Sequence, residues 1–110
     1  MGAARIVERR WIEDLLAGQM RLRCFYRRSG KTLDQFTVQL ELIDKGTWNP
    51  IVRYDNAHGF CHRDTIHADG SQEKLALHWG NLNQTFTYAI EDLKGNWQAH
   101  RERYLREMQS

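Results

Sequence analysis

The stretch Gln35-Phe36-Thr37-Val38-Gln39-Leu40-Glu41-Leu42 alternates polar and apolar side chains along its whole length. Because successive side chains of a β-strand point to opposite faces of a sheet, this pattern predicts a strand with one buried face. Two turn signals bound it, Ser29-Gly30-Lys31 before it and Asp44-Lys45-Gly46 after it. A strand that lies between two such turns is expected to pair with strands in the sequence on either side of it.

The flanking segments repeat the same two-residue period. Residues 20–27 predict a strand upstream, and residues 48–54 predict one downstream, with Pro50 favouring an edge position or the first residue of that strand. A further turn at residues 57–59 precedes a fourth predicted strand over residues 60–67. Strands that follow one another through short turns predict an antiparallel meander.

The two ends of the chain show helical spacing instead. At the N-terminus Val7, Trp11, Ile12 and Leu15 predict a short amphipathic helix over residues 5–16, and Gly18 is a natural stop beyond it. Residues 74–79 fit either a strand or a loop. After Gly80 one apolar stripe predicts a C-terminal helix, which Gly95 interrupts; its members are Leu82, Phe86, Ala89, Ile90, Leu93, Trp97, Tyr104 and Met108.

An apolar helical stripe needs a sheet face against which it can be buried. The predicted fold class is therefore α+β: a four-stranded antiparallel β-meander packed by the C-terminal helix, with the short N-terminal helix alongside. The 110 residues are enough for one domain, expected to cover residues 1–110.

Composition narrows the class of protein. The sequence has no apolar run long enough for a transmembrane helix, and its N-terminus lacks the apolar core of a secretion signal. Cys24 and Cys61 lie far apart, and together with the missing signal they favour a cytoplasmic location with both thiols reduced. The net charge of +2 does not itself point to nucleic acid.

The distribution of charge is more informative than its sum. A short segment holds five cations, and such a patch can bind phosphates or keep a solvated strand edge from aggregating; they are Arg21, Arg23, Arg27, Arg28 and Lys31.

Residues 53–67 hold the densest set of chemically versatile side chains. They include three of the five histidines, together with carboxylates and guanidinium groups: Arg53, Asp55, His58, His62, Arg63, Asp64 and His67. If His58-Gly59 forms a two-residue turn, Asp55 faces His62 and Arg53 faces Asp64 across the hairpin. Any turn with an even number of residues keeps these four on one face, and an odd one separates them.

Three uses of this face stay open at the level of sequence. Cross-strand ion pairs on a solvated sheet face would be purely structural. Asp55, His62 and Asp64 resemble a carboxylate-rich metal site, although no metal or other cofactor is expected. The third use is metal-independent phosphodiester cleavage, since histidine titrates near neutral pH and arginine binds phosphate in a bidentate way.

The hairpin also resembles known families. The pattern Arg53-Tyr54-Asp55-x-x-His58-Gly59, followed by His62-x-Asp64 and by Ala89-Ile90-Glu91-Asp92-Leu93-Lys94-x-Asn96-Trp97, is similar to a poorly characterised group of small bacterial proteins. Its first half resembles the TumE toxins of toxin–antitoxin modules, small α+β proteins thought to act on RNA. This chain lacks the proline and the paired histidines expected next to the Asp in that pattern.

The leading hypothesis is a toxin-like RNA-directed protein, with ribonuclease activity as its candidate chemistry. In it His58 and His62 transfer protons, Arg53 binds phosphate and Asp55 orients a ring. Accessory binding residues are Tyr54, Arg63, Asp64, His67, Arg21 and Arg23. RNA, an antitoxin-like protein or a second copy of the chain are the expected partners, and a membrane is not. The alternative is a non-catalytic interaction module, or small subunit of a complex, that makes contact through Trp11, Trp48 or the tail helix.

Overall fold

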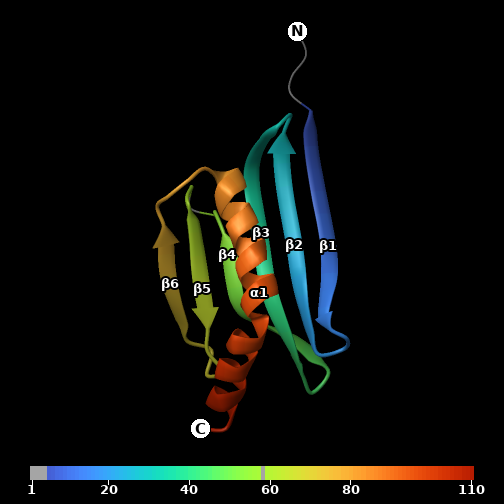
Figure 1. Cartoon of the computed structure of the whole chain (residues 1–110), viewed down its shortest axis with the longest axis vertical. Helices are drawn as coiled ribbons and strands as arrows, with labels where there is room; N and C mark the ends of the chain where they lie inside the picture. The colour runs from blue at the N-terminus through green and yellow to red at the C-terminus, as the bar shows by residue number, and fades with distance from the viewer. Residues whose placement is uncertain (1–4, 58) are drawn as a thin grey trace.

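The computed structural model describes residues 5–57 and 59–110. It contains a six-stranded antiparallel sheet in which each strand pairs with its neighbours in sequence, and one long helix that crosses a single face of the sheet (Figure 1). The strands are β1 Ile6–Leu16, β2 Met20–Ser29, β3 Thr32–Asp44, β4 Thr47–Asp55, β5 Cys61–Ile66 and β6 Gln72–Leu77, and the helix is α1 Leu82–Met108. The protein is thus α+β, and the antiparallel meander is confirmed.

The predicted N-terminal helix is wrong, because residues 6–16 form β1, which pairs with β2 from Ile6–Ser29 to Leu16–Met20. Val7, Trp11 and Leu15 are spaced by four residues, and this interval returns to the same face of a strand as well as to nearly the same side of a helix. Ile12, which favoured the helix, lies on the other face and is half exposed.

The predicted number of four strands is wrong for a second reason. Residues 72–77 form β6, a short edge strand whose first four residues are exposed. Such a strand has no face that must be apolar, so its sequence carries little of the alternation that identifies a buried strand.

The core lies between α1 and the three central strands. Phe36, Val38 and Leu40 of β3 are fully buried, as is Leu93 of the helix. The predicted helical stripe is confirmed for most of its members, but Met108 is exposed, and Gly95 does not interrupt the helix. Asn81 caps the helix and exchanges hydrogen bonds with Gln84 in a capping box.

Both cysteines belong to this core as free thiols. Burial raises the pKa of Cys24 to about 12 and that of Cys61 to about 11. Within the described residues, no helix has the length and apolar character needed to cross a membrane.

A buried polar contact joins the helix to the sheet. The Tyr54 hydroxyl of β4 donates to the Asp92 carboxylate of α1 at 2.6 Å, and Asn96 donates to the other oxygen at 2.8 Å. His100 beside this carboxylate, together with Tyr54 and Asn96, lowers the pKa of Asp92 to about 2, although burial acts in the opposite direction. The ionised carboxylate is therefore the form that the fold stabilises.

We expect Asp92→Asn to lower the free energy of unfolding by about 2 kcal/mol at pH 7, because a pKa lowered on folding stabilises the native state above the unfolded value. The difference from wild type should shrink as the pH falls from about 4 toward 2. Urea unfolding across this range measures it, with Glu91→Gln on the exposed side of α1 as the control. A difference that stays constant with pH would contradict this assignment.

Candidate functional site

The β4–β5 hairpin has an even register, one of the two cases that the sequence left open. Asp55 lies opposite His62, Arg53 opposite Asp64 and Val52 opposite Thr65. His58, one of the predicted proton-transfer residues, lies outside the described part of the chain.

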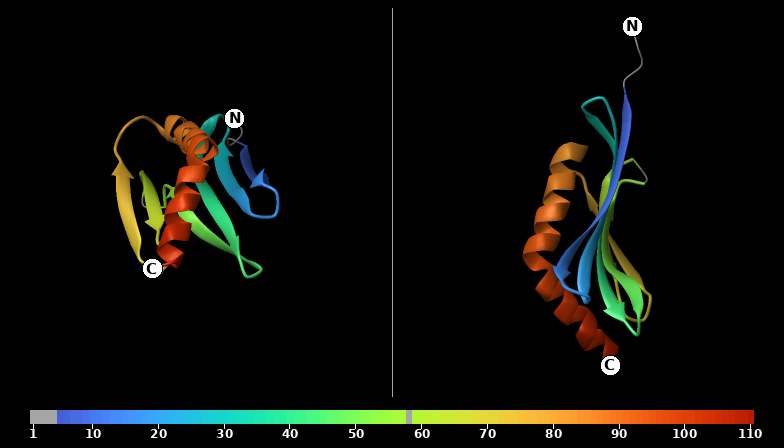
Figure 2. Two further views of the ribbon diagram at one scale, coloured as in Figure 1. Left: turned by 60° about the horizontal axis from the view of Figure 1, so that its bottom comes forward. Right: turned by 90° about the vertical axis from the view of Figure 1, so that its right-hand side faces the viewer.

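The two faces of this hairpin have different surroundings. Tyr54 points toward α1 through its bond to Asp92, and Arg63 lies opposite Tyr54 in the ladder, so both face the helix. Arg53, Asp55, His62 and Asp64 alternate with them and lie on the opposite face. Figure 2 shows that α1 covers only one side of the sheet. We call the uncovered side the open face.

Strand pairing places further side chains on the open face in register with these four. One row across the sheet consists of Ile12, Arg23, Gln39, Arg53, Asp64 and Lys74, and the neighbouring row consists of Arg10, Phe25, Thr37, Asp55, His62 and Ala76. Two of the predicted binding residues, Arg21 and Arg23, are therefore on the same face as the hairpin residues. Tyr54 and Arg63 are separated from them by the sheet.

Asp55 and His62 are in contact, but the imidazole is covered. His62 Nδ1 lies 3.4 Å from Asp55 Oδ1 and 3.3 Å from the Asp55 carbonyl oxygen. The Phe60 ring lies over the imidazole with centroids 5.1 Å apart, and only 3% of the His62 side chain is exposed. The two side chains are therefore neighbours, and the His62 ring is closed to solvent in this conformation, with Phe60 among the groups that cover it.

A chain of hydrogen bonds crosses the centre of the open face. Arg53 Nε donates to Gln39 Oε1 at 2.7 Å, and the Gln39 amide donates to Glu41. Glu41 also accepts from Arg21 Nε at 2.6 Å and from Arg23 Nε at 3.2 Å. The Glu41 carboxylate is buried, so two guanidinium groups and an amide compensate the cost of its desolvation.

At the centre of this face the carboxylates are recessed and several cations protrude, whereas Glu8 on the β1 edge is exposed. Asp64 is buried, and its Oδ1 lies 3.9 Å from Lys74 Nζ, which is too far for a hydrogen bond. The Lys74 and Arg23 side chains are 53% and 55% exposed. An approaching molecule therefore meets cationic groups before it meets the acids.

Two of the arginines lie over aromatic rings. The Arg10 guanidinium is 4.4 Å from the centroid of Phe25, and that of Arg21 is 4.1 Å from the centroid of Trp48. Beside the first pair is a cavity of about 600 Å³, whose lining includes Arg10, Ile12, Arg23, Phe25 and Thr37. Cation–π stacking holds the planar groups in place at the surface.

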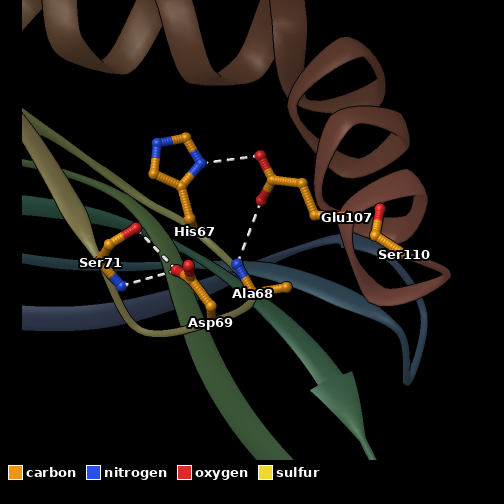
Figure 3. Close-up of a pocket in the computed structure, with 6 residues that line it drawn as sticks. All are labelled: His67, Ala68, Asp69, Ser71, Glu107 and Ser110. Carbon is orange, nitrogen blue, oxygen red and sulfur yellow. Dashed lines mark hydrogen bonds and ion pairs between the residues drawn. The ribbon is translucent and has the colours of Figure 1, made fainter.

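His67 lies away from the open face and lines a cavity of about 460 Å³ beside the C-terminal end of α1 (Figure 3). Its Nδ1 lies 2.7 Å from Glu107 Oε2, and the other oxygen of Glu107 accepts from the Ala68 amide at 3.1 Å. Arg103 donates to Glu107 and also to the Ile51 and Ile66 carbonyl oxygens. This cluster attaches the last turn of the helix to the sheet.

Sequence reasoning missed Glu107 and Arg103, because these residues are some forty positions from His67 and no local spacing links them. Among residues 5–57 and 59–110, no group of three or more histidine, cysteine or acidic side chains is arranged to hold a metal ion.

Comparison with known proteins identifies one family. A family model described as a domain of unknown function (DUF7718) matches residues 6–110. No curated protein and no solved structure matches the chain. The prediction that the chain belongs to an uncharacterised family is confirmed by this match. The resemblance to TumE toxins is not confirmed.

The hydrogen bond that His67 donates to the Glu107 carboxylate, opposed by desolvation and reinforced by Glu73, raises the pKa of His67 above its ordinary value of 6.5. A raised pKa stabilises the fold at pH below 6.5 and ceases to do so as the pH rises through the value in the folded state. We expect Glu107→Gln to return the His67 pKa toward 6.5 in an NMR titration. Glu102→Gln, on the exposed side of α1, is the matched control, and equal titration curves for all three proteins would refute the assignment.

Proposed function

We propose that this chain, which belongs to the DUF7718 family, is an RNA-directed protein that binds single-stranded RNA on the open face of its sheet. The observation that carries the proposal is the layering of charge at the centre of that face, where the buried Glu41 and Asp64 carboxylates lie beneath protruding cations. The Arg23 and Lys74 side chains are 55% and 53% exposed.

The phosphate backbone supplies most of the affinity in such complexes, through Lys and Arg side chains that displace counterions. Glu41 does not cancel this attraction, because its charge is already shared between Arg21 and Arg23. Asp64 and Asp55 oppose this attraction, but the cations of the same two rows outnumber them four to two; these cations are Arg10, Arg23, Arg53 and Lys74. The local field on the open face thus favours an anion although the net charge of the chain is only +2.

The aromatic side chains favour a single strand over a duplex. Unpaired bases stack on aromatic rings and on arginine guanidinium planes, and a sheet face is a common platform for this contact. Phe25 with Arg10 and Trp48 with Arg21 offer two such stacks. The cavity beside Phe25 provides room for a base next to the Arg23 guanidinium.

Cleavage of the bound RNA is the second candidate, favoured by the contact between Asp55 and His62. A base must come within hydrogen-bond distance of the ribose 2′-hydroxyl. Phe60, which is 41% exposed, would therefore have to turn away from the imidazole and from the His78 ring 5.2 Å from it. Arg53, in the same face, would stabilise the charge that develops on phosphate. Because activity of this kind is toxic, an antitoxin-like protein or a second copy of the chain that covers the open face would block it.

RNA binding is tested by the anisotropy of a fluorescently labelled, unstructured RNA. Because Arg23 is exposed on the open face, we expect Arg23→Ala to raise Kd by about 5-fold and to reduce the dependence of Kd on salt concentration. Arg106→Ala removes the same charge from the exposed end of α1 and is the matched control. Equal effects of the two substitutions, or no binding at low salt, would argue for the alternative of a protein-interaction module.

Cleavage is tested separately by incubating the same RNA with protein, with and without EDTA. We expect Asp55→Asn to reduce the cleavage rate at least about 10-fold, because it removes the carboxylate that lies 3.4 Å from His62 Nδ1, while Kd stays within about 2-fold. His62→Gln should have a larger effect, and circular dichroism verifies that it folds. Cleavage that EDTA abolishes would indicate a metal, and intact RNA with unchanged binding would leave a non-catalytic RNA-binding protein.

A further inference from the structure

We infer that the free edge of β1 pairs with β1 of a second copy of the chain, so that two sheets join into one. Among residues 5–57 and 59–110, β1 pairs with β2 alone, and it is an edge strand of eleven residues without proline or glycine. Its outer edge is not covered by α1, which crosses the central strands (Figure 1). A long uncovered edge is a template for another strand.

The hydrogen bonds of β1 show which backbone groups are available. The Gly30 amide donates to the Arg5 carbonyl oxygen at 2.7 Å, so Arg5 points its backbone groups toward β2. Because these groups alternate in direction along an antiparallel strand, Ile6, Glu8, Arg10 and Ile12 point theirs to the free edge. The side chains of the same four residues lie on the open face, in line with Arg10 over Phe25.

One register makes this edge complementary to itself. With Arg9 opposite Arg9 of the second copy, Ile6 faces Ile12 and Glu8 faces Arg10, each pair occurring twice about the two-fold axis. Ile6 and Ile12 are 56% and 51% exposed in the single chain. Isoleucine is usually buried, so this exposure is unusual for a strand whose free edge faces only solvent. On the helix side of the sheet, Val7 faces Trp11. Apolar pairs and pairs of opposite charge both stabilise facing positions.

Neighbouring registers are less favourable. A shift by one residue brings groups that face β2 opposite groups that face the edge, and the ladder is lost. Shifts by two residues place Glu8 opposite Glu8 or Arg10 opposite Arg10. A register centred on Ile12 pairs Arg10 with Asp14, but it leaves Ile6 exposed and runs through the irregularity between Asp14 and Leu16. In the inferred register Arg9 is the one residue that faces a like charge, namely Arg9 of the second copy. Both side chains are exposed and can turn away from each other.

Joining the two edges also joins the two open faces. Each copy brings its Arg10–Phe25 pair and the cavity beside it close to the two-fold axis. The dimer does not depend on the proposed RNA binding, since it uses backbone groups and side chains of β1 alone.

The test is a charge exchange followed by measurement of mass by light scattering after size exclusion. Wild-type protein should have about twice the 13.1 kDa of one chain. Glu8→Arg places two cations opposite each other and Arg10→Glu places two anions, so each single variant should be monomeric at concentrations where wild type is dimeric. The double variant Glu8→Arg/Arg10→Glu restores opposite charges and should be dimeric again.

Glu102→Arg on the exposed side of α1 is the control for a change of charge and should leave the mass unchanged. Circular dichroism establishes that each variant is folded. The inference would be overturned by a wild type that is monomeric at about 100 μM. It would equally be overturned by single variants that stay dimeric or by a double variant that stays monomeric. The double variant separates this register from the one centred on Ile12, where Glu at position 10 would face Asp14.

Discussion

One helix has to bury the apolar face of six strands, and this constraint shapes the whole molecule. The fully buried side chains gather where α1 crosses the middle of the sheet, on β2, β3 and β4. Toward both edges fewer side chains are covered, so β1 and β6 are mostly exposed, although Trp11 and Leu15 of β1 and Leu77 of β6 still pack against the core. Hydrophobic burial therefore stabilises the centre, while the edges depend on backbone pairing and on ion pairs such as Lys94–Glu13 at 2.8 Å.

The same constraint leaves the other side of the sheet without a covering layer. That face has to be compatible with water, and the chain meets this requirement with hydrogen-bonded charges. The Glu41 carboxylate connects β2 and β3 through Arg21, Arg23 and Gln39. This network compensates the desolvation of the buried Glu41 carboxylate, and it also positions guanidinium groups and aromatic rings at the surface. The open face is a candidate binding site for that reason.

The sequence was sufficient to predict secondary structure where the local pattern of apolar and polar residues shows which side chains are buried. Strands β2 to β5 and the apolar side of α1 were predicted, since alternation and turn chemistry determine them locally. The facing of Asp55 with His62 was expected only for a two-residue turn, because the sequence left the length of that turn open. β1 was misread because Val7, Trp11 and Leu15 suit either period, and β6 because Gln72–Leu77 is too exposed to show one. The contact between His67 and Glu107 depends on where the helix ends relative to the sheet, and no local pattern encodes that distance.

The two thiols lie at different places in the core. Cys24 is under the side of the sheet where the Glu13 and Lys94 charges act on it, whereas Cys61 lies near Thr85 in the first turns of the helix. Neither presents a thiolate in the native state, so alkylating reagents reach them only through transient opening. The modification rates of the two cysteines, resolved by mass spectrometry, would therefore report separately on transient opening near the middle of α1 and near its first turn.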